Sequence, residues 1–306
     1  MLNRVNWLSS CLGGDSEMAK RQMTVAGVAI LTLAIQGYAL EVGGFKPDKT
    51  VTYKKVGDVE LKLHIFNPQG HAATDKRPAI VFFFGGGWTG GSPSQFYPHC
   101  KYLASRGMVA MSAEYRIKGK HKTTPKECVK DGKSAVRWIR QHAKELGVDP
   151  ERVAAGGGSA GGHVAAATGT TKAFEEEGED QSVSSRPAAL VLFNPVYDNG
   201  PKGYGHSRVK DYWEQISPMH NITKETPPTI VFLGTKDKLI PTSTAEEYKK
   251  RMEAQGGRCD VHLYEGQPHG FFNYKNKQYY NKTVIEADKF LASLGYLKGE
   301  PTLKSE

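Results

Sequence analysis

One serine of this sequence lies in a setting that can make its hydroxyl a nucleophile. The stretch VAAGGGSAGG, residues 153–162, surrounds Ser159 with five glycines, directly after a short apolar run. Residues 157–161 match the pattern G-x-S-x-G, in which a sharp, strained turn between a strand and a helix presents the serine oxygen above the sheet. The amide of Ala160 then lies at a helix N-terminus, where unpaired N–H groups can bind a developing oxyanion.

Two other kinds of site also use such glycines. A phosphate-binding P-loop would need Gly-Lys-Ser or Gly-Lys-Thr, and neither follows. A dinucleotide fingerprint fits Gly156, Gly158 and Gly161, but its strand is not the first of the fold, and no acidic residue ends the next strand. The nucleophile is therefore favoured if a base and an acid accompany it.

A serine nucleophile needs a general base, and the base needs a carboxylate that fixes its tautomer. Asp237 comes just after one strand-like run, IVFLG, and His269 just after the next one, VHLYEG. The order Ser159, Asp237, His269 along the chain is one in which such triads occur. We predict that these three residues form a catalytic triad, with no metal and no cofactor.

Three further residues compete for these roles. Asp198 follows an earlier strand and is the alternative acid. Glu265 is nearer to His269 in sequence but lies on the strand side, which makes it a weaker candidate. His163 falls about one helical turn after the serine, and we expect it to pack rather than to act as the base.

A glycine-rich stretch after an early buried strand, FFFGGGWTGGS (82–92), offers further amide donors. Glycines let the backbone approach a ligand closely, so we assign Gly85 and Gly86, with Ala160, to an oxyanion hole. Trp88 is expected to form a wall of the acyl pocket, with Tyr197 as a second pocket residue.

Two segments interrupt the pattern of strands and helices. Residues 171–185 are acidic and are expected to form an exposed excursion, and the long segment 196–223 has the character of a lid or binding loop. Aromatic side chains near the site could stack on sugars or simply pack the lid. They are Trp88, Tyr97, Tyr197, Tyr204, Tyr212 and Trp213.

The elements that must position these residues alternate between short apolar runs and longer amphipathic runs. This alternation predicts an α/β fold with a mostly parallel sheet covered by helices on both faces. Strands are predicted at 59–66, 78–84, 108–115, 152–157, 188–195, 228–234 and 259–266. Helices are predicted at 94–107, 125–147, 160–169, 242–257 and 282–295.

With these motifs the chain resembles the α/β-hydrolase fold, and within it the hormone-sensitive-lipase-like esterases. The resemblance rests on FFFGGGW (82–88), SAEYRI (112–117), GGGSAGGHVAA (156–166), LGTKDKLIP (233–241) and GQPHGFF (266–272). Two positions depart from the family pattern: Phe84 stands where the oxyanion motif usually has His, and Gly158 stands where an acidic residue usually precedes the nucleophile.

The resemblance implies a serine ester hydrolase, similar to secreted bacterial esterases that remove acetyl or feruloyl groups from plant polysaccharides. It also implies a structural ion pair between Arg116 and Asp131. The alternatives are a serine peptidase of the prolyl-oligopeptidase type, a lipase and, less favoured, a non-catalytic binding module. The expected partner is a small-molecule or polysaccharide ester.

The N-terminus has the pattern of a signal peptide. Lys20 and Arg21 precede the apolar run TVAGVAILTLAI (24–35), and a small-residue site ends at Ala39. The run is short for a membrane span, although an uncleaved anchor is the alternative. We therefore predict a secreted or periplasmic protein, with residues 40–306 as one catalytic domain and no membrane span in the mature form.

Composition agrees with an ordinary globular enzyme. The 306 residues are 39% hydrophobic and 24% charged, and the formal net charge is +9. The lysines are scattered, without the basic stripe of a nucleic-acid-binding surface. Three cysteines follow the apolar run. We expect small buried side chains there, with a Cys100–Cys128 disulfide as the alternative.

Overall fold

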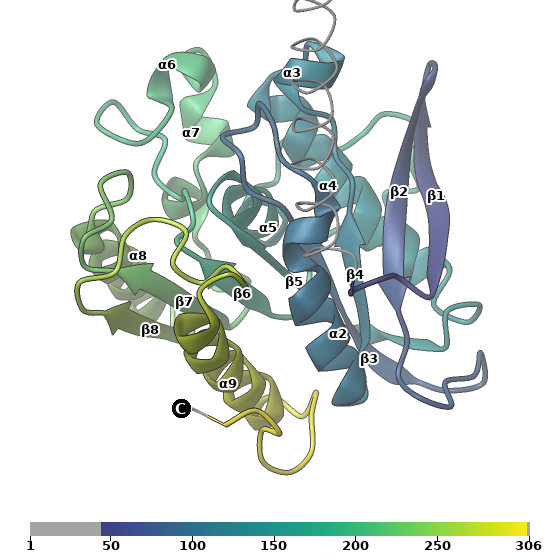
Figure 1. The fold of residues 1–306 in the computed structure, drawn as a ribbon. Helices are drawn as coiled ribbons and strands as arrows, with labels where there is room; N and C mark the ends of the chain where they lie inside the picture. The colour runs from purple at the N-terminus through teal and green to yellow at the C-terminus, as the bar shows by residue number, and fades with distance from the viewer. Residues whose placement is uncertain (1–43, 305–306) are drawn as a thin grey trace, which may run out of the picture. The chain divides into compact units, whose positions relative to one another are not determined.

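The computed structural model describes residues 44–304, whose strands form an eight-stranded sheet in the order β1-β2-β4-β3-β5-β6-β7-β8 (Figure 1). β2 pairs antiparallel with β1 and β4, and every other pairing is parallel. The predicted mostly parallel sheet is therefore confirmed. The strands are β1 (Lys49–Val56), β2 (Val59–Phe66), β3 (Arg77–Phe83), β4 (Val109–Ala113), β5 (Val148–Gly158), β6 (Leu190–Phe193), β7 (Thr229–Gly234) and β8 (Cys259–Tyr264).

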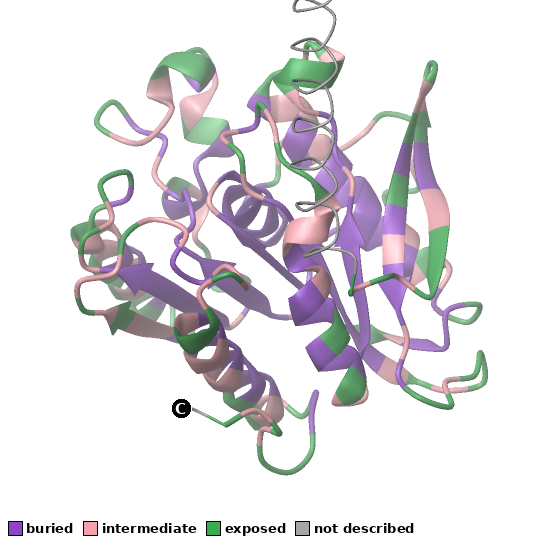
Figure 2. Cartoon of the chain, in the orientation of Figure 1, coloured by how far each residue is buried: buried purple, intermediate pink, exposed green. Residues whose placement is uncertain are grey.

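The central strands are apolar because they are buried on both faces (Figure 2). Alternate residues of β3 show this directly. Ile80 and Phe82 pack with side chains of α2 and α9, whereas Val81 and Phe83 pack with side chains of α4, α5 and α8. The helices are α2 (Tyr97–Ser105), α3 (Lys118–His121), α4 (Pro125–Gln141), α5 (Ala160–Thr170), α6 (His206–Val209), α7 (Trp213–Ile216), α8 (Thr242–Ala254) and α9 (Lys277–Ser293), with 3₁₀ turns η1 (Pro93–Phe96) and η2 (Pro218–Asn221).

Element boundaries differ from the sequence expectations at a few places. β1 was not predicted, although it pairs with β2 at the edge of the sheet. The helix expected to begin at residue 94 starts as the 3₁₀ turn η1, where the Ser92 side chain caps the turn. The helix expected over 125–147 begins at Pro125, behind a capping box between Thr124 and Glu127, but already ends at Gln141.

The acidic segment 171–185 is irregular, as expected, but it is not a free excursion. Glu176 contacts Lys54 at 2.5 Å and Lys130 at 3.1 Å, and Glu175 contacts Lys133 at 2.6 Å. The basic partners come from β1 and α4, and the side chains of Lys54 and Lys133 are almost fully buried. The acidic charge of the segment therefore helps to neutralise basic side chains that are buried beneath it.

The cysteines of the described chain are buried thiols. Cys100, Cys128 and Cys259 are all free, so the alternative of a Cys100–Cys128 disulfide is wrong. The Cys128 thiol donates to the backbone oxygen of Arg116 at 3.1 Å. Burial raises the pKa of each of these thiols, which keeps them protonated and unreactive at neutral pH.

The predicted signal peptide, its cleavage site near Ala39 and the alternative anchor lie outside the described residues. Within residues 44–304, no helix has the length and apolar character needed to cross a bilayer. Residues from Lys46 onward form one compact unit, which includes the segment 196–223 between β6 and β7.

Candidate active site

Ser159 occupies a sharp turn between β5 and α5. Its backbone has φ 55° and ψ −121°, a conformation that costs free energy for a residue with a side chain. The turn brings the backbone of residue 161 against the carbonyl oxygen of Phe83, with no space for a Cβ atom, so only glycine fits there. The glycine-rich sequence around Ser159 is thus explained by the close approach of β3, β5 and α5.

The three predicted catalytic residues come together in a row. The Ser159 hydroxyl lies 2.9 Å from Nε2 of His269, and Nδ1 of His269 lies 2.7 Å from Oδ2 of Asp237. The Asp237 side chain is fully buried, and its Oδ1 accepts the amide hydrogens of Leu239 and Ile240. The carboxylate is therefore fixed in position, and it fixes the tautomer in which Nε2 can accept the serine proton.

The competing residues lie elsewhere. The Oδ1 atom of Asp198 accepts the Gly200 amide hydrogen and lies 4.0 Å from His220, not beside His269. Glu265 is exposed. His163 is fully buried, its Nε2 lies 3.2 Å from the Ile216 carbonyl oxygen, and burial lowers its pKa to about 4. The expectation that His163 packs is confirmed.

The glycine loop after β3 requires one correction. The amide of Gly85 donates to Oε1 of Gln95 at 2.7 Å, so this N–H is already engaged and does not face an oxyanion freely. Within residues 44–304, the amide hydrogens of Gly86, Gly87 and Ala160 have no acceptor. The free amide donors of the loop are thus those of Gly86 and Gly87, one residue later than the predicted pair Gly85 and Gly86.

A cleft of about 350 Å³ opens at the serine. Ser159 and His269 line it, together with residues from several other segments. The lining residues are Gly85, Gly86, Gly87, Gln95, Ser159, Asn194, Tyr204, Leu239, His269, Gly270, Phe272 and Asn273. Three of these side chains are carboxamides, which no motif in the sequence marks as functional.

Both aromatic residues expected in the acyl pocket are instead part of the core. Trp88 is 2% exposed and packs edge-on against His163, with ring centroids 5.1 Å apart. Tyr197 is fully buried and stacks on Tyr248 at 4.6 Å. Neither lines the cleft, so their assignment as substrate-pocket residues is wrong; of the aromatic residues singled out in the sequence, Tyr204 is the one that lines it.

The two departures from the family pattern have physical explanations. Phe84 is buried and stacks on Tyr115 with centroids 4.2 Å apart, while its carbonyl oxygen accepts the Tyr115 hydroxyl hydrogen. At residue 158, the ring of Phe272 occupies the space where a side chain would begin, since an added Cβ would collide with the ring. Glycine at 158 and Phe272 therefore form a matched pair beside the nucleophile.

The ion pair implied by the family resemblance is present. Arg116 binds Asp131 with two guanidinium nitrogens, at 2.7 and 2.8 Å, and donates its backbone amide hydrogen to the same carboxylate. Asp131 is fully buried, and Lys54 approaches it to 2.7 Å as well. Two cations around one buried carboxylate tie β1, the loop after β4 and helix α4 together.

The segment 196–223 carries α6, α7 and η2 and lies at the upper left of the molecule in Figure 1. Arg208, on α6, donates from Nη1 to the carbonyl oxygen of Gly87 at 2.7 Å. Its guanidinium also lies 5.7 Å from the ring of Trp88. The insertion therefore contacts the glycine loop directly.

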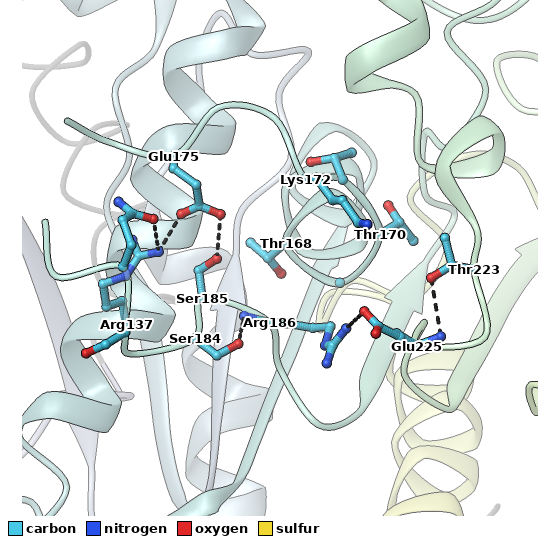
Figure 3. A pocket seen from close by; sticks show the side chains of 14 residues that line it. Arg137, Thr168, Thr170, Lys172, Glu175, Ser184, Ser185, Arg186, Thr223 and Glu225 are labelled. Carbon is cyan, nitrogen blue, oxygen red and sulfur yellow. Dashed lines mark hydrogen bonds and ion pairs between the residues drawn. The ribbon is translucent and has the colours of Figure 1, made fainter.

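A second hollow, of about 330 Å³, lies at the C-terminal end of α5, and no histidine or cysteine lines it (Figure 3). Four of its five charged side chains form ion pairs with one another: Arg137 binds Glu175, and Arg186 binds Glu225 at 2.5 Å. In residues 44–304, no group of three metal-ligating side chains is found either.

Comparisons with known proteins agree with this fold. Residues 80–273 match a family model described as alpha/beta hydrolase fold. Esterase LipC of Mycobacterium tuberculosis is 31% identical over 224 residues, which cover 65% of this chain and 54% of LipC. An acetylxylan esterase of Xylanibacter ruminicola is 23% identical over 291 residues, covering 90% of this chain and 55% of that protein. The chain thus spans just over half the length of these two relatives.

Among solved structures, esterase 2 of Thermogutta terrifontis with bound propionate has a TM-score of 0.80 and 44% sequence identity, covering 86% of this chain and 99% of that one. The family match spans more than half of the chain and includes the glycine loop, Ser159, Asp237 and His269. From the fold, the catalytic geometry and this match together, we conclude that the chain belongs to the alpha/beta hydrolase fold family.

Proposed function

We propose that this protein is a serine carboxylesterase that hydrolyses short acyl esters. The observation that carries the proposal is the hydrogen-bonded row of Ser159, His269 and Asp237 beside a cleft with free amide donors. The relatives and structural neighbours named above are esterases, which supports the same reaction.

The residues take the following roles in this proposal. His269 accepts the Ser159 proton through Nε2 as the serine oxygen attacks the ester carbonyl, and Asp237 stabilises the imidazolium that forms. The oxyanion receives hydrogen bonds from the amides of Gly86, Gly87 and Ala160. His269 then returns the proton to the leaving alcohol, and a water molecule hydrolyses the acyl-enzyme by the reverse sequence of proton transfers.

The size of the cleft favours a short acyl group. Phe272 closes the wall beside Gly158, and the whole cleft of about 350 Å³ must also hold the alcohol. The similar Thermogutta esterase 2 is described with propionate bound, which supports an acyl group of this length. For the alcohol we propose a carbohydrate, because the relative that aligns over 90% of this chain is an acetylxylan esterase.

The test is a burst experiment with p-nitrophenyl acetate on the full chain. We expect an initial burst of nitrophenolate followed by steady turnover in the wild type, and neither in Ser159→Ala. The matched control is Ser94→Ala, whose hydroxyl bonds, among residues 44–304, to the Ser92 hydroxyl alone. Equal activity in Ser159→Ala and wild type would refute the proposal, and turnover of peptide amides without ester turnover would favour a peptidase.

Substrate choice needs a separate panel. We expect kcat/KM to fall as the acyl chain lengthens from acetate to octanoate, and acetylated xylan fragments to be deacetylated. A preference for octanoate would indicate a lipase-like pocket instead. For the cellular location we propose export, on the basis of the apolar run at 24–35; N-terminal sequencing of the protein from its native host should then begin near residue 40.

A further inference from the structure

Three carboxamide side chains surround the catalytic cleft and join its loops. The amide of Gly85 donates to Oε1 of Gln95 at 2.7 Å, and Nε2 of Gln95 donates to Oδ1 of Asn273 at 2.9 Å. Nδ2 of Asn273 then donates to the carbonyl oxygen of Gly270 at 2.7 Å. A continuous chain of hydrogen bonds thus runs from the glycine loop to the loop that carries His269.

The chemistry at the two ends fixes the orientation of both amides. A backbone N–H can only donate, so the oxygen of Gln95 must face Gly85 and its NH₂ group must face Asn273. The Gly270 carbonyl can only accept, so the NH₂ group of Asn273 must face it, which leaves the Asn273 oxygen for Gln95. A carboxylate at either position would lack the donor that the next link requires.

Asn194 holds the same loop from its other side. It follows β6 directly, is fully buried, and its Oδ1 accepts the Gly270 amide hydrogen at 2.9 Å. Its Nδ2 lies 3.4 Å from Nε2 of His269. Both the N–H and the C=O group of Gly270, the residue after the catalytic histidine, are therefore bound by side-chain amides.

We propose that Gln95 and Asn273 are positioning residues that set the distance between the oxyanion-binding amides and the imidazole of His269. The proposal rests on the triad assigned above. Because Gln95 binds the Gly85 amide, it fixes the peptide that precedes the free amides of Gly86 and Gly87. Because Asn273 binds the Gly270 carbonyl oxygen, it fixes the loop of the general base. A misplacement of about 1 Å between such groups can lower the rate roughly 10²-fold.

The alternative role for these side chains is to bind the alcohol of the substrate, since both line the cleft. The two roles predict different kinetics. Loss of a positioning residue lowers kcat by a similar factor for every substrate. It also lowers the rate at which a small fluorophosphonate, which has no carbohydrate part, phosphonylates Ser159. Residues that bind the alcohol change KM, and only for substrates that carry that alcohol.

The experiment uses Gln95→Ala, Asn273→Ala and the double variant, with Ser94→Ala, next to Gln95 on η1, as the matched control. Each single variant removes two hydrogen bonds that position the groups of the transition state, and we expect it to lose roughly 10-fold in kcat. The same loss should appear for p-nitrophenyl acetate, for acetylated xylobiose and in the rate of phosphonylation. The double variant should lose little more than either single variant, because each breaks the same chain.

A more selective variant is Gln95→Glu. It keeps the acceptor for the Gly85 amide but loses the donor to Asn273, so it should also lower kcat although its size is unchanged. Thermal unfolding of all variants separates this effect from loss of the fold. The proposal would be overturned if kcat and the phosphonylation rate were unchanged in these variants. It would also be overturned if the only effect were a higher KM for the xylobiose ester. The triad assignment would survive that result, because Ser159→Ala tests it independently.

Discussion

A buried histidine without hydrogen-bond partners among the described residues should give the stability of this fold a measurable pH dependence. His99, on α2, is 1% exposed, and neither of its ring nitrogens has a hydrogen-bond partner among the described residues. Its ring packs among aromatic side chains: Phe82, Phe96, Phe193, Phe272 and Tyr280. Burial lowers the pKa of His99 to about 3, because the apolar surroundings oppose the charged form.

The magnitude follows from linkage between protonation and folding. The unfolded chain takes up a proton at this histidine below a pH of about 6.5, whereas the folded protein does not until about pH 3. Above pH 6.5, His99 is neutral in both states and does not lower the free energy of unfolding. As the pH falls from 6.5 toward 3, the free energy of unfolding decreases by about 1.4 kcal/mol per pH unit. Between pH 7 and pH 5, His99 should account for a loss of about 2 kcal/mol in the free energy of unfolding.

The assay is urea unfolding followed by circular dichroism at pH 7, 6 and 5. We expect His99→Leu to lose about 2 kcal/mol less than the wild type across this range. Phe96→Leu is the control: it removes packing in the same cluster but no titratable group, so its whole curve should shift without a change in slope. If His99→Leu and the wild type lose stability in parallel, the reasoning about His99 is refuted.

Three further perturbations test other parts of the structure. Asp237→Asn should lower kcat by up to about 10⁴-fold, as in a comparable serine triad, while Asp198→Asn should leave kcat unchanged; equal losses in an ester assay would contradict the assigned acid. Gly158→Ala should destabilise the protein by about 1–3 kcal/mol through its collision with Phe272, and an unchanged melting temperature would show that the ring moves aside. Burial alone would raise the pKa of Glu176, but its hydrogen bonds with lysines outweigh burial and lower it. The Glu176 carboxylate therefore stabilises the fold above its ordinary pKa, and this stabilisation is lost in acid. In denaturant unfolding, Glu176→Gln should lower the free energy of unfolding by about 1–3 kcal/mol at pH 7 and by less near pH 3. Equal losses at both pH values would contradict this role.

The sequence was sufficient to predict that Ser159, Asp237 and His269 meet, because each of them follows a strand and parallel strands end at the same edge of a sheet. Ser159, Asp237 and His269 are more than 30 residues apart from one another, yet the strand order alone brings them together. The glycines near Ser159 were informative for a related reason: close backbone contacts exclude side chains, and that restriction is visible in the residue types.

The residues that the sequence did not identify act through partners far along the chain. Gln95 and Asn273 are 178 positions apart, and an amide side chain has no distinctive spacing. Because Gln95 was not identified, its hydrogen bond with the Gly85 amide was not predicted either. Trp88 was misassigned because a large aromatic side chain suits a pocket wall and a core equally well, and only the positions of His163 and Tyr204 distinguish the two.

The bond between Arg208 and Gly87 has a consequence for engineering this enzyme. The segment 196–223 is the natural choice for exchange with a homologue when a new substrate range is wanted. Such a chimera would also remove the guanidinium that holds the carbonyl oxygen of Gly87, beside the amides that we propose for the oxyanion hole. We therefore expect turnover to fall even with a well-chosen pocket. Arg208 and the stretch 85–91 therefore have to be transplanted together, as a single module.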